Sequence, residues 1–170
     1  MRNLVLALAF VVLGSGGASA QQQTQQPAQT PSCGGPEYRQ LDFWVGTWDG
    51  VYAGGTAVNE ITRQFDDCVI QEDFNGGGLI GRSVSMYHAP AGQWRQTWVD
   101  NQGGFYTLAG GPVGDDLILH LVRVSDTAPQ QRMVFEDITP NAFTWRWQSS
   151  TDNGATWTDQ WLINYTRRQS

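Results

Sequence analysis

Two charged side chains are placed where they could support chemistry in an otherwise apolar interior. Residues 58–65 and 68–74 alternate as two neighbouring antiparallel strands do, and Asp66-Asp67 between them fits a two-residue turn. This pairing predicts that Arg63 and Glu72 lie diagonally on the inner face. Such a pair could orient a polar group of a ligand, or Glu72 could act as a general base while Arg63 stabilises negative charge.

Patterns for other kinds of catalysis do not occur in the sequence. The chain contains no Lys, which excludes lysine Schiff bases, Ser-Lys dyads and a standard phosphate-loop lysine. Its two histidines, His88 and His120, fall in no metal-ligand spacing such as HExxH, and there is no GxSxG nucleophile motif. We therefore assign no catalytic residue and no metal site, and the sequence favours a protein that is not an enzyme.

Two segments that look like binding motifs are better interpreted as turns. Gly76–Ser83 has the spacing of a phosphate loop, with Arg82 in the lysine position, but it continues as a strand and not as the required helix. Ser150–Trp157 matches the Asp-box pattern of sialidase propellers, which repeat the box, whereas this chain has one copy. We expect it to stabilise a hairpin with Trp157 beneath it and to carry no glycosidase activity.

Short segments rich in β-branched and aromatic residues must position these side chains. From Thr47 onward, clusters of Gly, Asn, Asp and Pro divide the chain into about ten such segments, and helical periodicity is weak. Residues 36–43 are the exception and could form one short helical turn. We expect an all-β fold, an antiparallel up-and-down barrel of about ten strands, because closure leaves no exposed strand edge.

Alternation within these segments indicates which side chains point into the barrel. Besides Arg63 and Glu72, the residues expected to line an internal cavity are Gln96, Trp98, Trp145, Trp147 and Trp161. The same reading places Phe65 and Trp157 inside, with Asp159 as a further polar exception. An aromatic interior with a few polar groups is typical of a barrel that keeps a small ligand cavity.

The first 20 residues have the pattern of a signal peptide. Arg2 precedes an apolar run from Leu4 to Leu13, and Ala18-Ser19-Ala20 is a small-residue cleavage site. The Gln-rich residues 21–32 read as a disordered leader, which leaves 33–170 as a single barrel domain. We expect a periplasmic or secreted protein without a membrane anchor, because the apolar run is too short to span a bilayer.

Charge and cysteine content agree with that location. The formal net charge of the whole chain is −6, and removal of Arg2 with the signal peptide makes it more negative, so nucleic acid and anionic membranes are poor partners. An exported protein with two cysteines most often pairs them, and we expect a disulfide between Cys33 and Cys68. Two free buried thiols are the alternative.

Several motifs together resemble a family of exported bacterial proteins of unknown function. They are an opening of the form DFWxGxW within Leu41–Trp48, then Cys68–Glu72, Trp94–Asp100 and the Asp-box hairpin. The resemblance extends from about Cys33 to Arg167. It implies a calycin, that is a lipocalin-like barrel, in which Gly46 and Trp48 close one end, and it brings no established activity.

A more distant similarity is to nitrobindin, a ten-strand haem barrel with a similar Gly-Thr-Trp opening. Its haem ligand is a His late in the chain, whereas the last predicted strand here, residues 157–168, has no His. Only His88 or His120 could substitute. We therefore expect no cofactor and regard haem as disfavoured.

The sequence leads to one principal hypothesis and two alternatives. The principal hypothesis is an exported lipocalin-like barrel that binds a small apolar or aromatic molecule in an aromatic-lined cavity. One alternative is an envelope interaction domain whose barrel is filled and holds no ligand. The other is a cavity enzyme with Glu72 as general base. Fold alone does not decide among them. An open cavity is needed for the binding and enzyme hypotheses, whereas a filled interior would exclude both.

Overall fold

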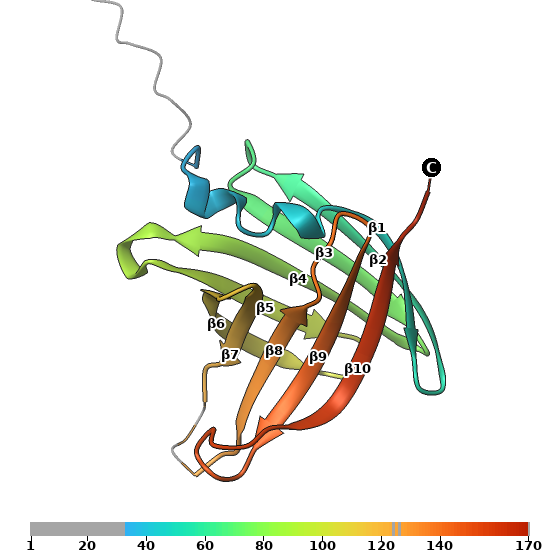
Figure 1. Ribbon diagram of the computed structural model, residues 1–170, viewed down its shortest axis with the longest axis vertical. Coiled ribbons are helices and arrows are strands. Elements are labelled where there is room, and N and C mark those ends of the chain that lie inside the picture. The colour runs from blue at the N-terminus through green and yellow to red at the C-terminus, as the bar shows by residue number, and fades with distance from the viewer. Residues whose placement is uncertain (1–32, 124, 126, 170) are drawn as a thin grey trace, which may run out of the picture.

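The chain forms a closed antiparallel β-barrel, shown in Figure 1. The computed structural model describes residues 33–169 except 124 and 126, so the expected signal peptide (1–20) and leader (21–32) lie outside the described residues. Strands follow one another around the barrel, and β1 (Gly46–Tyr52) pairs with β10 (Thr158–Arg167) to close it. The prediction of an all-β up-and-down barrel with a short N-terminal helical turn is confirmed.

Eight further strands lie between β1 and β10 in the sequence. They are β2 (Gly55–Gln64), β3 (Val69–Gly76), β4 (Leu79–His88), β5 (Gln93–Asp100), β6 (Phe105–Val113), β7 (Asp116–Leu121), β8 (Gln130–Glu136) and β9 (Ala142–Ser150). Three 3-10 turns complete the described elements, namely η1 (Pro36–Arg39), η2 (Asp42–Trp44) and η3 (Ala89–Ala91). No helix among the described residues is both long and apolar enough to cross a membrane.

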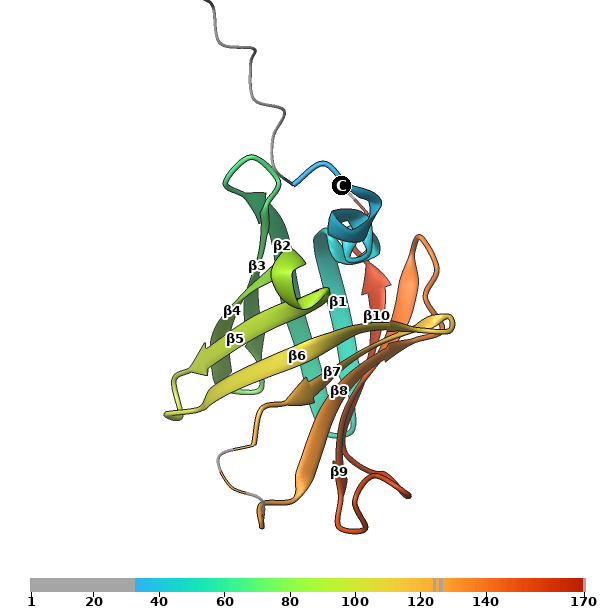
Figure 2. The ribbon, with the colours of Figure 1, turned by 90° about the vertical axis from the view of Figure 1, so that its left-hand side faces the viewer.

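Successive connections alternate between the two ends of the barrel, as Figure 2 shows. We call the end that holds connection 65–68 and the turns η1 and η2 the capped end. The opposite end, with connections 53–54, 77–78 and 101–104, is called the mouth. This division matters because the two ends are filled differently.

The pairing of β2 with β3 follows the predicted register. Ile61 lies opposite Glu72, and Arg63 lies opposite Ile70. Ile61 and Ile70 are almost fully buried, and only 8% of Glu72 is exposed, so the expected face does point inward. Side-chain alternation was sufficient to fix this register because a one-residue slip would turn every apolar group outward.

The turn between these strands is also as expected, but Phe65 is not. The Cys68 amide donates to the Phe65 carbonyl oxygen at 3.2 Å, and Asp66 and Asp67 between them have positive φ angles of 54° and 65°. The chain has left the strand geometry already at Phe65, whose φ is 52°. Its side chain is therefore 78% exposed, and the prediction that it points inward is wrong.

The capped end is closed by residues that precede the first strand. In Figure 2, η1 and η2 lie across this end of the barrel. Leu41 and Trp44 are almost fully buried there, and the Trp48 indole Nε1 donates to the Trp44 carbonyl oxygen at 2.7 Å. Burial of these three large apolar side chains stabilises the cap by about 1.5–3 kcal/mol for each.

Arg167 at the end of β10 holds the same cap in place by hydrogen bonds to its backbone. Its guanidinium donates to the carbonyl oxygens of Val45 at 2.8 Å and Phe43 at 2.9 Å, and it lies 4.1 Å from the centroid of the Trp48 ring. Gly46 has a φ of 134°, and a side chain there would meet the Arg167 guanidinium. Glycine is therefore required where the cap enters β1.

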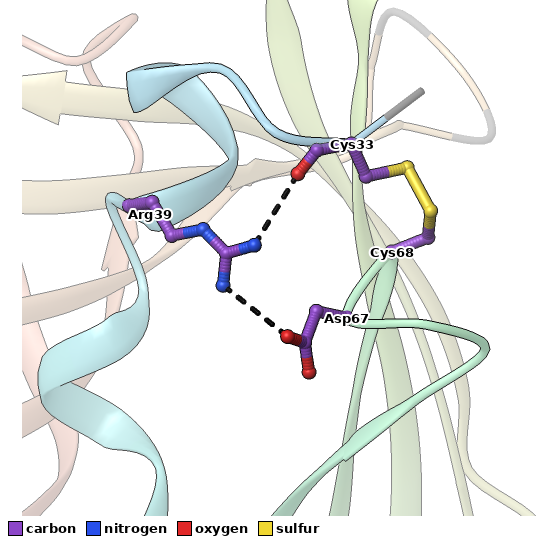
Figure 3. Close-up of a disulfide and its surroundings, with 4 residues drawn as sticks. All are labelled: Cys33, Arg39, Asp67 and Cys68. Atoms are coloured by element: carbon purple, nitrogen blue, oxygen red, sulfur yellow. Dashed lines mark hydrogen bonds and ion pairs between the residues drawn. A yellow bond between two sulfur atoms is a disulfide. The ribbon is translucent and has the colours of Figure 1, made fainter. Parts of the chain in front are cut away.

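The predicted disulfide joins Cys33 to Cys68, as Figure 3 shows. Its Cα atoms lie 5.2 Å apart, and it attaches the segment before η1 to the start of β3. Arg39 lies beside it, with Nη2 donating to the Cys33 carbonyl oxygen at 3.4 Å and Nη1 3.8 Å from Asp67 Oδ2. The bridge thus holds the cap against the β2–β3 turn.

The last hairpin departs from simple alternation at one point. Trp161 lies opposite Trp147 and Ile163 opposite Trp145, but the register shifts between Asp159 and Trp161. Such a bulge turns the residues before it to the other face. Two inward predictions are consequently wrong, those for Asp159 and Trp157.

Both residues lie on the outer side of the barrel. Asp159 accepts a hydrogen bond from Gln148 at 2.8 Å and pairs with Arg146. The Trp157 ring lies under the Arg132 guanidinium, 4.0 Å from its Cζ, and beside His120. These contacts give an aromatic side chain a specific place outside the barrel.

The Asp-box segment is a turn with its own hydrogen bonds, as predicted. The Gly154 amide donates to Ser150 Oγ, the Thr156 amide donates to Asp152 Oδ1, each at 2.8 Å, and Gly154 has a φ of 86°. The Trp157 Nε1 donates to the Gly154 carbonyl oxygen at 3.1 Å. These bonds account for Ser150, Asp152 and Thr156 of the motif by turn formation.

Candidate functional site

A cavity of about 250 Å³ lies inside the barrel on the mouth side. Its wall reaches from buried Glu72 to Gln102 in connection 101–104 and to Tyr106, which is 39% exposed. Because its lining runs from buried to exposed residues, the cavity communicates with solvent at the mouth. The capped end, by contrast, is filled by side chains.

Six of the seven residues expected to line a ligand cavity do line it. They are Glu72, Gln96, Trp98, Trp145, Trp147 and Trp161. The tryptophans come from the neighbouring strands β9 and β10 and from β5, which lies across the barrel from them. Alternation could find them because Trp98, Trp145 and Trp147 lie within unbroken stretches of strand, and Trp161 begins the unbroken stretch that follows the register shift.

Trp161 is the centre of the aromatic wall. Its ring meets those of Trp145 and Phe74 at centroid distances of 5.7 Å and interplanar angles of 87° and 85°, and that of Tyr52 at 5.3 Å. Edge-to-face contacts are the favoured arrangement of aromatic rings and fix their orientation. Two indole walls consequently meet at nearly a right angle beside the cavity.

Trp98 forms another wall, held in place from two sides. Its Nε1 donates to Asp100 Oδ2 at 2.8 Å. Its ring also occupies the space that a side chain at position 81 would fill, so Gly81 allows the indole to lie across β4. The ring is thus oriented by one hydrogen bond and by the absence of one Cβ atom.

A buried hydrogen-bonded network includes two polar residues of the lining, Glu72 and Gln96. Asn59 Nδ2 donates to Glu72 Oε1 at 2.8 Å, Ser83 Oγ donates to Glu72 Oε2 at 2.6 Å, and Gln96 Nε2 donates to Ser83 Oγ at 3.0 Å. All four side chains are more than nine-tenths buried. Because β2, β3, β4 and β5 are adjacent, the network crosses four strands on one side of the barrel.

Burial raises the pKa of Glu72 to about 7, although hydrogen bonds from Ser83 and Asn59 oppose the shift. The carboxyl therefore exchanges its proton near neutral pH while it faces an aromatic cavity. Burial, together with the charge of Glu72, also raises the pKa of Tyr165, which lines the same cavity, well above its ordinary value. Tyr165 is thus neutral wherever Glu72 titrates.

The predicted pairing of Arg63 with Glu72 is wrong. Arg63 forms an ion pair with Asp42 of η2 at the capped end, and its side chain is 21% exposed. It is not part of the described cavity lining. The diagonal register is correct, but the cap supplies a nearer carboxylate, which the sequence pattern of β2 and β3 alone could not reveal.

Sequence reasoning missed Asp100 and Tyr106, which line the cavity, and Ser83, which donates to Glu72 but does not itself line the cavity. Ser83 and Asp100 were not selected, although the pairing of β4 with β3 and β5 places Ser83 next to Glu72 and Trp98. Tyr106, whose ring centroid lies 5.7 Å from that of Trp147, was also missed. A register derived for β3 and β4 would have identified Ser83, but Asp100 and Tyr106 depend on how connection 101–104 closes.

The histidines lie outside this site. His88 is exposed at the end of β4, and His120 contacts Trp157 on the outer face. Among the described residues, no three of His, Cys, Asp and Glu gather where they could hold a metal ion. The chemistry of the cavity is thus set by its aromatic rings and by two hydrogen-bonded carboxyl groups, buried Glu72 and half-buried Asp100.

Fold and site together define a closed ten-stranded barrel with one capped end and a small aromatic cavity. Comparison with known proteins finds no matching family model and no matching curated protein.

Proposed function

We propose that this protein is an exported, lipocalin-like barrel that binds a small apolar or aromatic molecule in its cavity. The observation that carries the proposal is the cavity of about 250 Å³, walled by four tryptophans and containing one buried carboxyl network. Apolar walls with a few convergent polar groups are the usual composition of a small-molecule site. Export is supported by the signal-like N-terminus and agrees with the Cys33–Cys68 disulfide.

The arrangement of the interior favours binding over the filled-barrel alternative. The capped end is packed by Leu41, Trp44 and Trp48, whereas the large side chains of the mouth half leave space between them. Side chains packed as closely as those at the capped end would have left no such space. The barrel is therefore better described as a container than as a solid core.

The enzyme alternative has less support. Glu72 lies in the cavity with a pKa of about 7, as a general base would, but Arg63 is paired with Asp42 and is not available to stabilise negative charge. The Ser83 hydroxyl does lie beside Glu72, but Ser83 is not among the described residues that line the cavity, so no nucleophile with a base beside it faces the cavity there. Binding is thus the function that the site supports best.

Titration of the purified protein with indole, a neutral bicyclic aromatic, tests the proposal. Isothermal calorimetry should give saturable one-to-one binding to the wild-type barrel. Trp145→Ala removes one wall and should weaken binding about tenfold or more, because an aromatic contact and its buried area are lost.

Trp157→Ala is the matched control, since Trp157 lies outside the barrel against Arg132. This variant should bind indole with unchanged affinity, even if its melting temperature falls. Absence of saturable binding to the wild-type protein, or equal weakening by Trp145→Ala and Trp157→Ala, would contradict the proposal.

A further inference from the structure

The charges around the cavity are all of one sign. Its described lining contains Glu72 at the deep end and Asp100 near the mouth, and none of the described lining residues is Lys, Arg or His. The Trp98 indole and the backbone amides of Gly104 and Gln102 hold the pKa of Asp100 below its ordinary value, so this group is ionised at neutral pH. A ligand that enters the cavity therefore passes one carboxylate and meets a second.

The charged groups near Glu72 do not neutralise it. Arg63, on the same face of β2, is paired with Asp42 at the capped end, and Asp73 points outward, where it accepts a hydrogen bond from Arg82 at 2.6 Å. From the other elements the carboxyl is faced by the neutral Asn59, Ser83 and Tyr165. A buried carboxylate without a cationic partner is costly, and a cation from outside would offset that cost.

The walls are also suited to a cation. The rings of Trp145 and Trp161 meet at 87°, and Tyr106 and Trp147 continue the aromatic lining toward the mouth. Aromatic faces attract ammonium groups, most strongly where water is excluded, and cages of such rings recognise organic cations. An anionic ligand would instead meet two carboxyl groups and the negative faces of the rings.

Resting on the proposed function, we propose that the ligand is a small organic cation. Its apolar or aromatic body packs against the tryptophans, and its ammonium group meets Glu72. The net formal charge of −6 favours the approach of such a molecule over that of an anion. The inference narrows the ligand class from apolar or aromatic molecules in general to amines.

A series of three probes that share one ring system and differ in charge tests this inference. Tryptamine carries an ammonium group, indole-3-ethanol a hydroxyl group and indole-3-acetate a carboxylate. Calorimetric titration at about pH 8, where Glu72 is ionised, should give an affinity for tryptamine about tenfold or more above that for indole-3-ethanol, with indole-3-acetate the weakest. At about pH 5.5 Glu72 is protonated, and the preference for tryptamine over indole-3-ethanol should shrink.

Variants that remove one charge test which carboxyl group causes the preference for tryptamine over indole-3-ethanol. Glu72→Gln should lower tryptamine affinity about tenfold and change indole-3-ethanol affinity much less. Asp73→Asn is the matched control, because it removes an equal charge from the next residue on the outer face and should preserve the preference. If Glu72→Gln does not fold, Asp100→Asn serves as the second variant and should reduce the preference to a smaller extent.

The outcomes separate this inference from the function on which it rests. Equal affinities for tryptamine and indole-3-ethanol, or a preference that survives Glu72→Gln, would overturn the cationic ligand while leaving a binding barrel in place. Failure of indole and of all three probes to bind would remove the proposed function itself.

Discussion

At Glu72, burial and hydrogen bonding act in opposite directions on one carboxyl group. Burial disfavours the ionised form, while the donors Asn59 and Ser83 favour it, and the result is a pKa of about 7. Asp152 in the Asp-box turn shows the contrasting case, because it is exposed and bonds from Thr156 and Ser150 lower its pKa to about 2. A carboxyl group therefore titrates near neutral pH in the cavity, whereas in the exposed turn it stays ionised and accepts hydrogen bonds.

The raised pKa of Glu72 predicts how the free energy of unfolding changes with pH. Folded Glu72 binds its proton more tightly than the unfolded chain does, so the folded state loses stability as pH rises from about 4.5 to about 7. Glu72→Gln cannot lose a proton. The free energy of unfolding of this variant, relative to wild type, should therefore increase by about 3 kcal/mol across that range, measured by urea denaturation.

Glu60→Gln is the control for this experiment, since Glu60 is exposed on the neighbouring strand β2. The difference in free energy of unfolding between Glu60→Gln and the wild-type protein should stay nearly constant with pH. A constant difference for Glu72→Gln as well would mean that Glu72 is solvated in the folded protein.

At the element scale, the two ends of the barrel are built from different parts of the chain. The capped end depends on η1 and η2, which are held by Arg167 and by the Cys33–Cys68 bridge. The mouth consists of hairpin connections of the strands themselves. The cap can therefore be loosened without changing a residue of the cavity wall.

Removal of the disulfide tests this separation. The bridge closes a loop with a sequence separation of 35, so the double variant Cys33→Ser, Cys68→Ser should lose about 3–4 kcal/mol of unfolding free energy. Its far-ultraviolet circular dichroism should remain that of a β-barrel, and indole should still bind. A reductant should destabilise the wild-type protein by a similar amount and leave the variant unaffected; equal stability of the variant and the oxidised protein would refute this role for the bridge.

The sequence predicted those elements in which alternation is uninterrupted. The β2–β3 register and the inward positions of Gln96 and Trp98 followed from a period of two and a short turn. The inward prediction for Trp157 was wrong because the register shifts between Asp159 and Trp161, and simple alternation takes no account of such a bulge.

Long-range contacts account for the remaining error in the site. The partner of Arg63 is Asp42, which lies 21 positions earlier in the chain and reaches β2 only because η2 folds over the barrel end. A strand pattern predicts neighbours within a sheet, but it cannot predict what covers the end of that sheet.

At the scale of the whole molecule, the barrel combines a rigid frame with one filled and one hollow half. Every strand is paired on both sides, so no strand edge is left to associate with another chain. The filled half holds the frame together, and the hollow half presents tryptophans and a buried carboxyl group to a cavity of about 250 Å³. We propose that this hollow half holds a small molecule.

Native mass spectrometry tests that claim most directly, on protein purified without denaturant from the organism that encodes it. We expect the mass of the disulfide-bonded chain plus one small organic molecule, which is released on denaturation and is bound far less by Trp145→Ala than by Trp157→Ala. The bare chain as the sole species in the wild-type preparation, or an adduct that Trp145→Ala and Trp157→Ala retain equally, would contradict it.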